Sequence, residues 1–209
     1  MFNPFKKNIF LIAVLGPDGS GKSTLINNLM IKYSNLANNY YSHLYPNSKS
    51  SLNLDSKSRV LYPYSGKPYP SYLSIAKIIY MLIKNFFSYI IILFKNNPSI
   101  QDIIWCDRYL YDIFSDPLRY RISKIFFNFK FLKKFIIKPN LIIIINPPVK
   151  VILKRSKELS YKELNKLNKS YDKLHKFLPE ALLISSESSF EDVVELCEKK
   201  INKFIHTVK

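Results

Sequence analysis

The chain has 209 residues and a mass of 24.6 kDa, the size of one ordinary domain, and its 47% hydrophobic and 22% charged residues exclude wholesale disorder. It has only two cysteines, Cys106 and Cys197, so no disulfide framework is predicted and we expect a reducing, cytoplasmic setting. The formal net charge of +17 fits affinity for nucleic acid, anionic lipid or small phosphorylated molecules, and it also fits a surface made basic by A/T-rich codons.

Short β-branched runs alternate with longer helical stretches, a pattern typical of an α/β fold in which helices cover a parallel sheet on both faces. The predicted strands are 9–15, 40–45, 102–106, 141–145 and 181–184. The predicted helices are 22–36, 71–95, 122–137, 161–177 and 190–204. The sequence contains no internal repeat and no linker, so we expect residues 1–209 to form a single domain.

Two apolar stretches raise the question of a membrane segment. Residues 1–15 combine a basic start with a short apolar run that leads directly into a glycine loop, so a buried first strand explains them better than a signal peptide. Residues 75–94 are long and apolar enough for a transmembrane helix, but Lys77, Lys84 and Asn85 interrupt them. A central lysine costs about 2.5–3.5 kcal/mol on insertion. We therefore expect a helix that is buried or that rests on a membrane surface.

A phosphate-binding motif follows the first predicted strand. Residues 16–23 read Gly-Pro-Asp-Gly-Ser-Gly-Lys-Ser and fit G-x-x-x-x-G-K-[ST] between an apolar strand and an amphipathic helix. Gly16, Gly19 and Gly21 let several backbone N–H groups point at one phosphate. Lys22 can bridge the β- and γ-phosphates, and the Ser23 hydroxyl can bind Mg²⁺. The motif predicts nucleotide binding.

A carboxylate ends the predicted third strand, at the edge of the sheet where open parallel sheets bind ligands. We expect Asp107 to hold a magnesium-bound water or to orient the acceptor, and Arg108 to bind an acceptor phosphate through its planar guanidinium. Asp112 lies four residues after Arg108 and can pair with it. For Asp116 and Arg119, a role in the site and a role in helix capping or solvation are equally open.

With these residues the sequence resembles the thymidylate kinases and the wider thymidylate-kinase-like group of phosphate-loop (P-loop) proteins. The features that carry the resemblance are the loop 16–24, Asp107-Arg108-Tyr109, Pro139-Asn140-Leu141 entering a strand that ends at Pro148, and Arg155 with a short lid before Tyr171. The resemblance implies a three-layer nucleoside monophosphate kinase fold with five parallel strands. It also implies ATP as the donor, Mg²⁺, and a nucleoside monophosphate acceptor, by default thymidine monophosphate.

The resemblance also implies roles for individual residues. Asp18 would face the acceptor sugar and Arg108 its phosphate, while Arg155, Lys157 and Lys162, in a lid at about 155–163, would face the donor phosphates. A loop at about 46–70, rich in Ser, Asn, Tyr and Pro, would lie on the acceptor side. The expected catalytic residues are Lys22, Asp107, Arg108 and Arg155. The expected nucleotide-binding residues are Gly16, Asp18, Gly19, Ser20, Gly21, Lys22, Ser23 and Thr24, and the expected metal ligands are Ser23 and Asp107.

Three parts of the pattern differ from the thymidylate kinases. Tyr45 stands before Pro46 where that family usually has arginine, residues 110–117 replace the stretch that helps to recognise the base, and the lid is poor in arginine. All three parts touch the acceptor or the transition state in that family. The resemblance therefore predicts the donor more firmly than the acceptor.

Residues 118–139 hold seven basic residues and no acidic one, interleaved with five phenylalanines. Such a stretch fits, in decreasing order, a helix with its phenylalanines in the core, a helix on an anionic membrane, and a helix along nucleic acid.

Together these features predict an ATP- and Mg²⁺-dependent kinase that phosphorylates a small molecule, by default dTMP to dTDP. Two alternatives stay open: a kinase of a sugar or surface-glycan intermediate, and a peripheral membrane protein regulated by nucleotide binding. The expected partner is the small acceptor. A homodimer and weak contact with an anionic membrane are open as well, and nucleic acid is not favoured.

Overall fold

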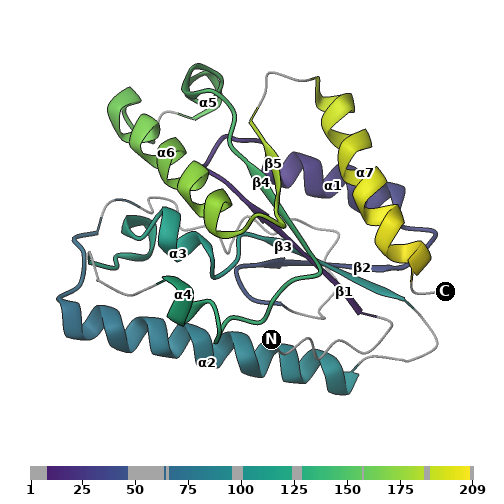
Figure 1. The fold of residues 1–209 in the computed structure, drawn as a ribbon, viewed down its shortest axis with the longest axis horizontal. Coiled ribbons are helices and arrows are strands. Elements are labelled where there is room, and N and C mark those ends of the chain that lie inside the picture. Colours follow the sequence, from purple (N-terminus) through teal and green to yellow (C-terminus); the bar gives the residue numbers. More distant parts are fainter. Residues whose placement is uncertain are drawn as a thin grey trace.

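In the computed structural model, five parallel strands form one sheet in the order β2-β3-β1-β4-β5 (Figure 1). The structure describes residues 9–46, 64, 66–95, 101–123, 129–156, 158–185 and 189–207. The strands are β1 (Ile9–Leu15), β2 (Asn38–His43), β3 (Asp102–Asp107), β4 (Leu141–Ile145) and β5 (Leu182–Ile184). The predicted parallel sheet is confirmed, and all five strands lie within two residues of the predicted limits at both ends.

Helices cover both faces of the sheet, as predicted. One face is covered by α1 (Lys22–Lys32) and α7 (Phe190–Thr207). The other is covered by α2 (Ser71–Lys95), α3 (Asp112–Ser115), α4 (Phe129–Leu132) and α6 (Tyr161–Phe177). The short helix α5 (Val149–Arg155) follows β4 directly.

The central position of β1 follows from its sequence. Every residue of β1 is buried, because helices lie over both faces of the strand. Ile9, Leu11, Ala13 and Leu15 face the core under α2 and α6, while Phe10, Ile12 and Val14 face the core under α1 and α7. A strand that is apolar on both faces can only be satisfied inside such a three-layer arrangement.

The predicted helix over 122–137 is wrong where the structure describes this stretch. A 3-10 helix occupies Leu118–Tyr120, and the described residues between it and β4 contain only one α-helical turn, α4. Arg121 has a left-handed φ of 54° that ends the first turn. The backbone N–H of Ser123 then donates to Ser74 Oγ of α2 at 3.0 Å, so a contact with a distant helix replaces the local helical hydrogen bond.

The phenylalanines of this stretch were expected in the core. Phe131 and Phe135 are instead 55% and 56% exposed, and Leu132 and Ile136 take the buried positions. The side chains of the other three phenylalanines, Phe126, Phe127 and Phe129, lie outside the described residues.

Helix α2 has the predicted limits, and one side of it is buried while the opposite side is exposed. Ser74, Ile78, Met81, Asn85 and Tyr89 line its buried side. In the described part of the chain α2 is the one helix long and apolar enough to cross a membrane, and 28% of its most apolar window is buried.

The opposite side of α2 is the apolar face of α2, as it is called below. It consists of ten large, exposed apolar side chains: Tyr72, Leu73, Ile75, Ile79, Tyr80, Ile83, Phe86, Phe87, Ile91 and Phe94.

Candidate active site

The phosphate loop connects the end of β1 to the start of α1. Its first glycine has no room for a side chain, because a Cβ on Gly16 would lie 2.2 Å from the carbonyl oxygen of Ile145 on the neighbouring strand β4. Gly21 has a φ of 98°, which favours glycine, and is the N-cap of α1 without a side-chain capping bond. The first backbone N–H groups of α1 therefore point toward the loop, where an anion can accept from them.

Two polar side chains of the loop fit a phosphate ligand. The buried Lys22 Nζ donates to the carbonyl oxygen of Pro17 at 2.7 Å, so the side chain folds back over the loop. Burial and the nearby Arg108 lower the pKa of Lys22 to about 8. The buried Ser20 Oγ has no hydrogen-bond partner in the described part of the chain. A phosphate oxygen would satisfy this hydroxyl and compensate the buried ammonium.

Asp107, at the carboxyl end of β3, lies beside the loop because β3 pairs with β1 in a register that sets Asp107 opposite Val14. Ser23 Oγ donates to Asp107 Oδ2 at 2.7 Å, and Tyr41 OH donates to the same oxygen at 2.9 Å. Burial favours the neutral form of Asp107, but the Lys22 charge and the Ser23 hydrogen bond outweigh it, so the pKa of Asp107 is lowered.

The Ser23 hydroxyl and the Asp107 carboxylate fit Mg²⁺, which prefers oxygen ligands and keeps several waters. Among the described residues there is no cluster of three or more His, Cys, Asp or Glu side chains that could hold a metal ion. A metal at this place would therefore be held by few protein atoms, Ser23 Oγ and the Asp107 carboxylate, as Mg²⁺ usually is beside phosphates.

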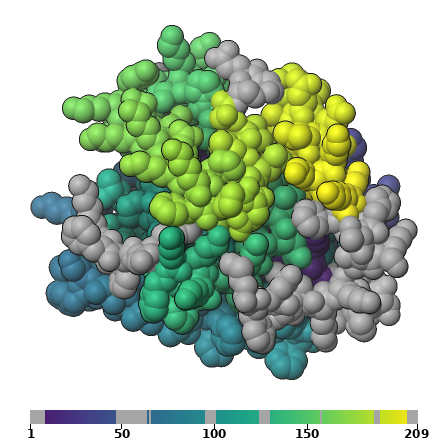
Figure 2. Space-filling view, in the orientation of Figure 1, coloured from purple at the N-terminus to yellow at the C-terminus, as the bar shows by residue number. Residues whose placement is uncertain are grey.

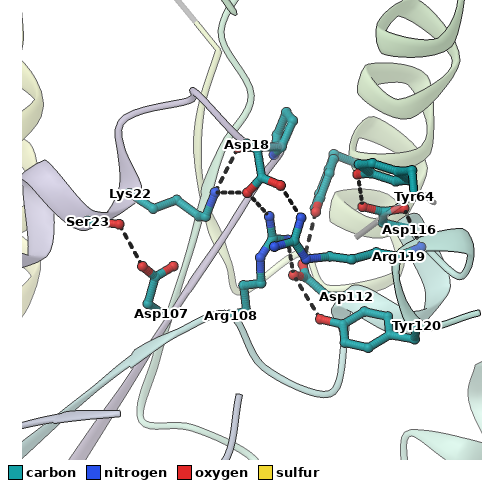
Figure 3. A network of polar contacts seen from close by, with 12 residues as sticks. Asp18, Lys22, Ser23, Tyr64, Asp107, Arg108, Asp112, Asp116, Arg119 and Tyr120 are labelled. Atoms are coloured by element: carbon teal, nitrogen blue, oxygen red, sulfur yellow. Dashed lines mark hydrogen bonds and ion pairs between the residues drawn. The ribbon is translucent and has the colours of Figure 1, made fainter. Parts of the chain in front are cut away.

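Arg108 is the centre of a buried ionic network (Figure 3). Its Nη1 donates to Asp112 Oδ2 at 2.6 Å, and its Nη2 donates to Asp18 Oδ1 at 2.5 Å. The side chain is 1% exposed. Burial opposes its charge, but Asp112 and Asp18 outweigh burial and hold the pKa of Arg108 well above the usual value. The predicted pairing of Arg108 with Asp112 is confirmed.

Asp18 connects this network to the phosphate loop. The guanidinium of Arg119 donates to Asp18 Oδ2, and Lys22 Nζ lies 3.9 Å from Asp18 Oδ1. Burial opposes ionisation of Asp18, but the three surrounding cations outweigh it and hold the pKa of Asp18 well below its ordinary range. One carboxylate thus pairs with two arginines that converge on it, and Arg108 has a second partner in Asp112.

The structure separates the roles that were left open for Asp116 and Arg119. Asp116 caps the 3-10 helix by accepting from the Arg119 backbone N–H at 3.3 Å, and it also accepts from Tyr64 OH at 2.6 Å. Burial raises the pKa of Asp116, although the Tyr64 hydrogen bond acts against the shift. The Arg119 side chain instead joins Asp18 in the site.

Two tyrosines contact acids of the site, and the sequence patterns did not predict these contacts. Tyr171 OH donates to Asp112 Oδ1 at 3.0 Å, and Tyr41 OH donates to Asp107. Tyr171 stands in the buried stripe of α6 with Leu167 and Leu174, so a hydroxyl in an otherwise apolar stripe was the available signal. A buried tyrosine hydroxyl usually has a partner, and here the partner is an acid of the network.

Of the remaining predicted residues, Arg155 lies beside the phosphate loop. It is the last residue of α5, and a Cβ on Gly21 of the loop would lie 3.5 Å from Arg155 Nη1. Thr24 and Lys162 are exposed, in the first turns of α1 and α6. Lys157 lies outside the described residues.

No protein-family model and no curated protein matches this chain. Solved structures do match. The thymidylate kinase from Candida albicans has a TM-score of 0.60 at 17% identity, covering 94% of this chain and 93% of its own. The thymidylate kinase from Ehrlichia chaffeensis has a TM-score of 0.57 at 14% identity, covering 93% and 98%. A deoxyadenosine kinase from M. mycoides with bound dCTP has a TM-score of 0.53 at 18% identity, covering 93% and 100%. The chain has the fold of these phosphate-loop kinases.

Proposed function

We propose that the chain is a cytoplasmic phosphotransferase that uses ATP and Mg²⁺ to phosphorylate a small acceptor, by default dTMP to dTDP. The observation that carries the proposal is the shared carboxylate of Asp18, which contacts Lys22 of the phosphate loop on one side and Arg108 and Arg119 on the other. A donor-phosphate site and a cluster of guanidinium groups are thereby held next to each other. Phosphoryl transfer needs this proximity more than it needs covalent catalysis.

On the donor side, the loop from Gly16 to Gly21 would hold the polyphosphate through its backbone N–H groups. Lys22 would exchange the Pro17 carbonyl for phosphate oxygens, and Arg155 would add a second cation from the end of α5. Ser23 and Asp107 would hold Mg²⁺, which offsets negative charge on the phosphates.

On the acceptor side, Arg108 and Arg119 present cations suited to a phosphorylated molecule. Asp18 is a poor base, because its pKa is held well below the ordinary range. A neutral hydroxyl acceptor benefits from a base, whereas an acceptor phosphate is already ionised and needs cations. This contrast favours a nucleoside monophosphate over an unphosphorylated sugar or nucleoside.

We propose further that residues 1–209 act as one domain, with an acceptor-side loop at about 46–70 and a short lid at about 155–163. Two contacts of described residues support these positions. Tyr64 contacts Asp116 next to Arg119, and Arg155 lies beside the phosphate loop.

The direct test measures ADP formation by purified protein with ATP, Mg²⁺ and a panel of nucleoside monophosphates, nucleosides and sugars. We expect dTMP to be an acceptor and Lys22→Ala to lower turnover by roughly 10²–10³, the cost of losing a major charge stabiliser. Lys169→Ala, which removes an exposed lysine of α6, is the matched control and should keep wild-type turnover. Equal ADP formation by wild type and Lys22→Ala would refute the proposal.

A further inference from the structure

Tyr41 of β2 contacts the carboxylate that is expected to lie beside the metal. Its OH donates to Asp107 Oδ2 at 2.9 Å, and Ser23 Oγ donates to the same oxygen at 2.7 Å. Among the described residues, Asp107 Oδ1 has no hydrogen-bond partner. One carboxylate oxygen is therefore held from two sides, by a strand and by the first turn of α1, and the other is left for a ligand. The lone pairs of Ser23 Oγ also stay available, because this hydroxyl uses its proton on Asp107.

The position of the Tyr41 hydroxyl follows from the pairing of β2 with β3. Tyr41 lies opposite Trp105, two residues before Asp107, so its side chain is on the same face of the sheet as the Asp107 carboxylate. Its ring packs against the core under α1 and α7, and α7 is the yellow helix in Figure 2. Because packing restricts the rotamers of the ring, the hydroxyl at its end has a fixed place.

Asp107 needs this support because other charges act on it. Burial opposes its ionisation, but the charges of Lys22 and Arg108 and the Ser23 hydrogen bond outweigh burial and lower the pKa of Asp107. A carboxylate that turned toward either of these cations would lose its bond with Ser23. The Tyr41 hydroxyl opposes such a rotation, because it holds Oδ2 at the place where Ser23 reaches it.

We propose that Tyr41 is a positioning residue for the metal site, whose hydroxyl fixes the Asp107 carboxylate so that Asp107 and Ser23 bind Mg²⁺ together. This role rests on the proposed function, in which these two residues hold Mg²⁺ beside the donor phosphates. Groups that orient a metal ligand without touching the metal contribute strongly to metal binding, since the ligand otherwise has to be ordered by the metal itself.

A purely structural role of the Tyr41 hydroxyl has different consequences. A hydrogen bond that only stabilises the end of β2 changes the stability of the protein and leaves the Mg²⁺ affinity of the folded nucleotide complex as it was. A positioning role lowers this Mg²⁺ affinity and leaves the affinity for nucleotide without Mg²⁺ unchanged. The two affinities, both measured on the folded protein, therefore separate the two roles.

Isothermal titration calorimetry on the purified full chain provides both affinities. A non-hydrolysable ATP analogue is titrated in the presence of EDTA, and Mg²⁺ is then titrated into the complex prepared without EDTA. Tyr41→Phe, which keeps the ring, should weaken Mg²⁺ binding by roughly 10–100-fold, as the loss of an outer-shell partner usually does. Its affinity for the analogue in EDTA should equal that of wild type. Equal Mg²⁺ affinity in Tyr41→Phe and wild type would overturn the proposal.

Two further variants show whether the effect belongs to Tyr41 and passes through Asp107. Tyr40→Phe makes the same substitution at the neighbouring residue of β2, whose ring packs against the opposite core, and should keep the wild-type Mg²⁺ affinity. Asp107→Ala removes the carboxylate, so adding Tyr41→Phe to it should weaken Mg²⁺ binding no further. Effects that add in the double variant would show that Tyr41 does not act through Asp107, against the proposal.

The same titrations distinguish a failure of this role from a failure of the proposed function. If wild type binds no analogue with or without Mg²⁺, the proposed kinase activity is refuted, and the role of Tyr41 with it. If wild type binds both the analogue and Mg²⁺ and Tyr41→Phe binds them equally well, only the role of Tyr41 is refuted.

Discussion

At the level of single residues, Arg108 shows how the site constrains the backbone. Its φ of 75° lies in the left-handed region, which costs a non-glycine residue about 1–3 kcal/mol when it is held there. Its backbone N–H donates to the Val14 carbonyl at 2.9 Å, and its side chain is fixed by Asp18 and Asp112. The backbone turn and the two ion pairs together aim the guanidinium at the loop.

A prediction at this scale concerns the protonation of Lys22. Its pKa of about 8 in the free protein should rise when a polyphosphate binds, because negative charge favours the ammonium form. Above about pH 8 nucleotide binding should therefore take up a proton, and ATP affinity should fall as the pH rises through this value. Below it, Lys22 is already charged and no uptake is expected.

Isothermal titration calorimetry of ATP binding just above pH 8, in two buffers with different ionisation enthalpies, measures this uptake. The observed heat should depend on the buffer for wild type but not for Lys22→Met. A buffer-independent heat for the wild type would contradict the prediction.

A second prediction concerns Gly16. A Cβ at this position would lie 2.2 Å from the Ile145 carbonyl oxygen, which belongs to the backbone of β4 and cannot move freely. Gly16→Ala should therefore separate the ends of β1 and β4 and lower the stability by roughly 1–3 kcal/mol, the usual cost of forced overpacking. Urea unfolding measures the loss. Lys169→Ala is the control, and a Gly16→Ala midpoint equal to wild type would show that the strand ends can separate without cost.

At the level of elements, the 3-10 helix Leu118–Tyr120 decides where Arg119 lies. Asp116 caps this short turn, and Arg121 ends it with a left-handed φ. Because the turn is held from both ends, Arg119 faces Asp18 rather than solvent. The position of a cation in the site thus depends on the limits of one three-residue helix.

If Arg119 binds the acceptor phosphate, Arg119→Met should raise the KM for the acceptor by roughly 10–100-fold, since a hydrogen bond to a charged group contributes about 1.5–3 kcal/mol. The affinity for ATP should change little, because Arg119 contacts Asp18 Oδ2, whereas Lys22 of the phosphate loop lies near Asp18 Oδ1. Steady-state kinetics with each substrate varied in turn separates the two effects. Arg121→Met, which removes a neighbouring arginine that bonds to the Lys67 carbonyl instead, is the matched control. An unchanged acceptor KM would place the acceptor phosphate elsewhere.

At the level of the whole molecule, the charge of +17 and the apolar face of α2 act in opposite directions on self-association. Two copies with this charge repel each other, while the apolar faces attract without any charge of their own. Added salt screens the repulsion and leaves the apolar contact in place.

Any self-association through the apolar face of α2 should therefore tighten as salt is added, which sedimentation equilibrium at increasing sodium chloride measures. Contact with anionic lipid would weaken under the same conditions. A dimer that dissociates on adding salt would show that ion pairs, rather than the apolar face, hold it together.

The parallel sheet and most of the helices around it follow from local patterns in the sequence. In β1 and β4 nearly every residue is apolar, which only a strand covered on both faces satisfies. The phosphate loop can also be recognised from the sequence, because consecutive residues form the motif and set its backbone conformation. For the same reason α2 and α6 have the limits that their patterns predicted.

The contacts between polar groups, in contrast, depend on how the elements pack in three dimensions. Asp107 reaches Ser23 because β3 pairs with β1, and Tyr171 reaches Asp112 because α6 packs beside α3. Packing also explains why 122–137 is not one helix, since the backbone N–H of Ser123 bonds to Ser74 of α2, far away in sequence. Hydrophobic periodicity reports which side of an element is buried. It carries no information about which distant partner a buried polar group will find.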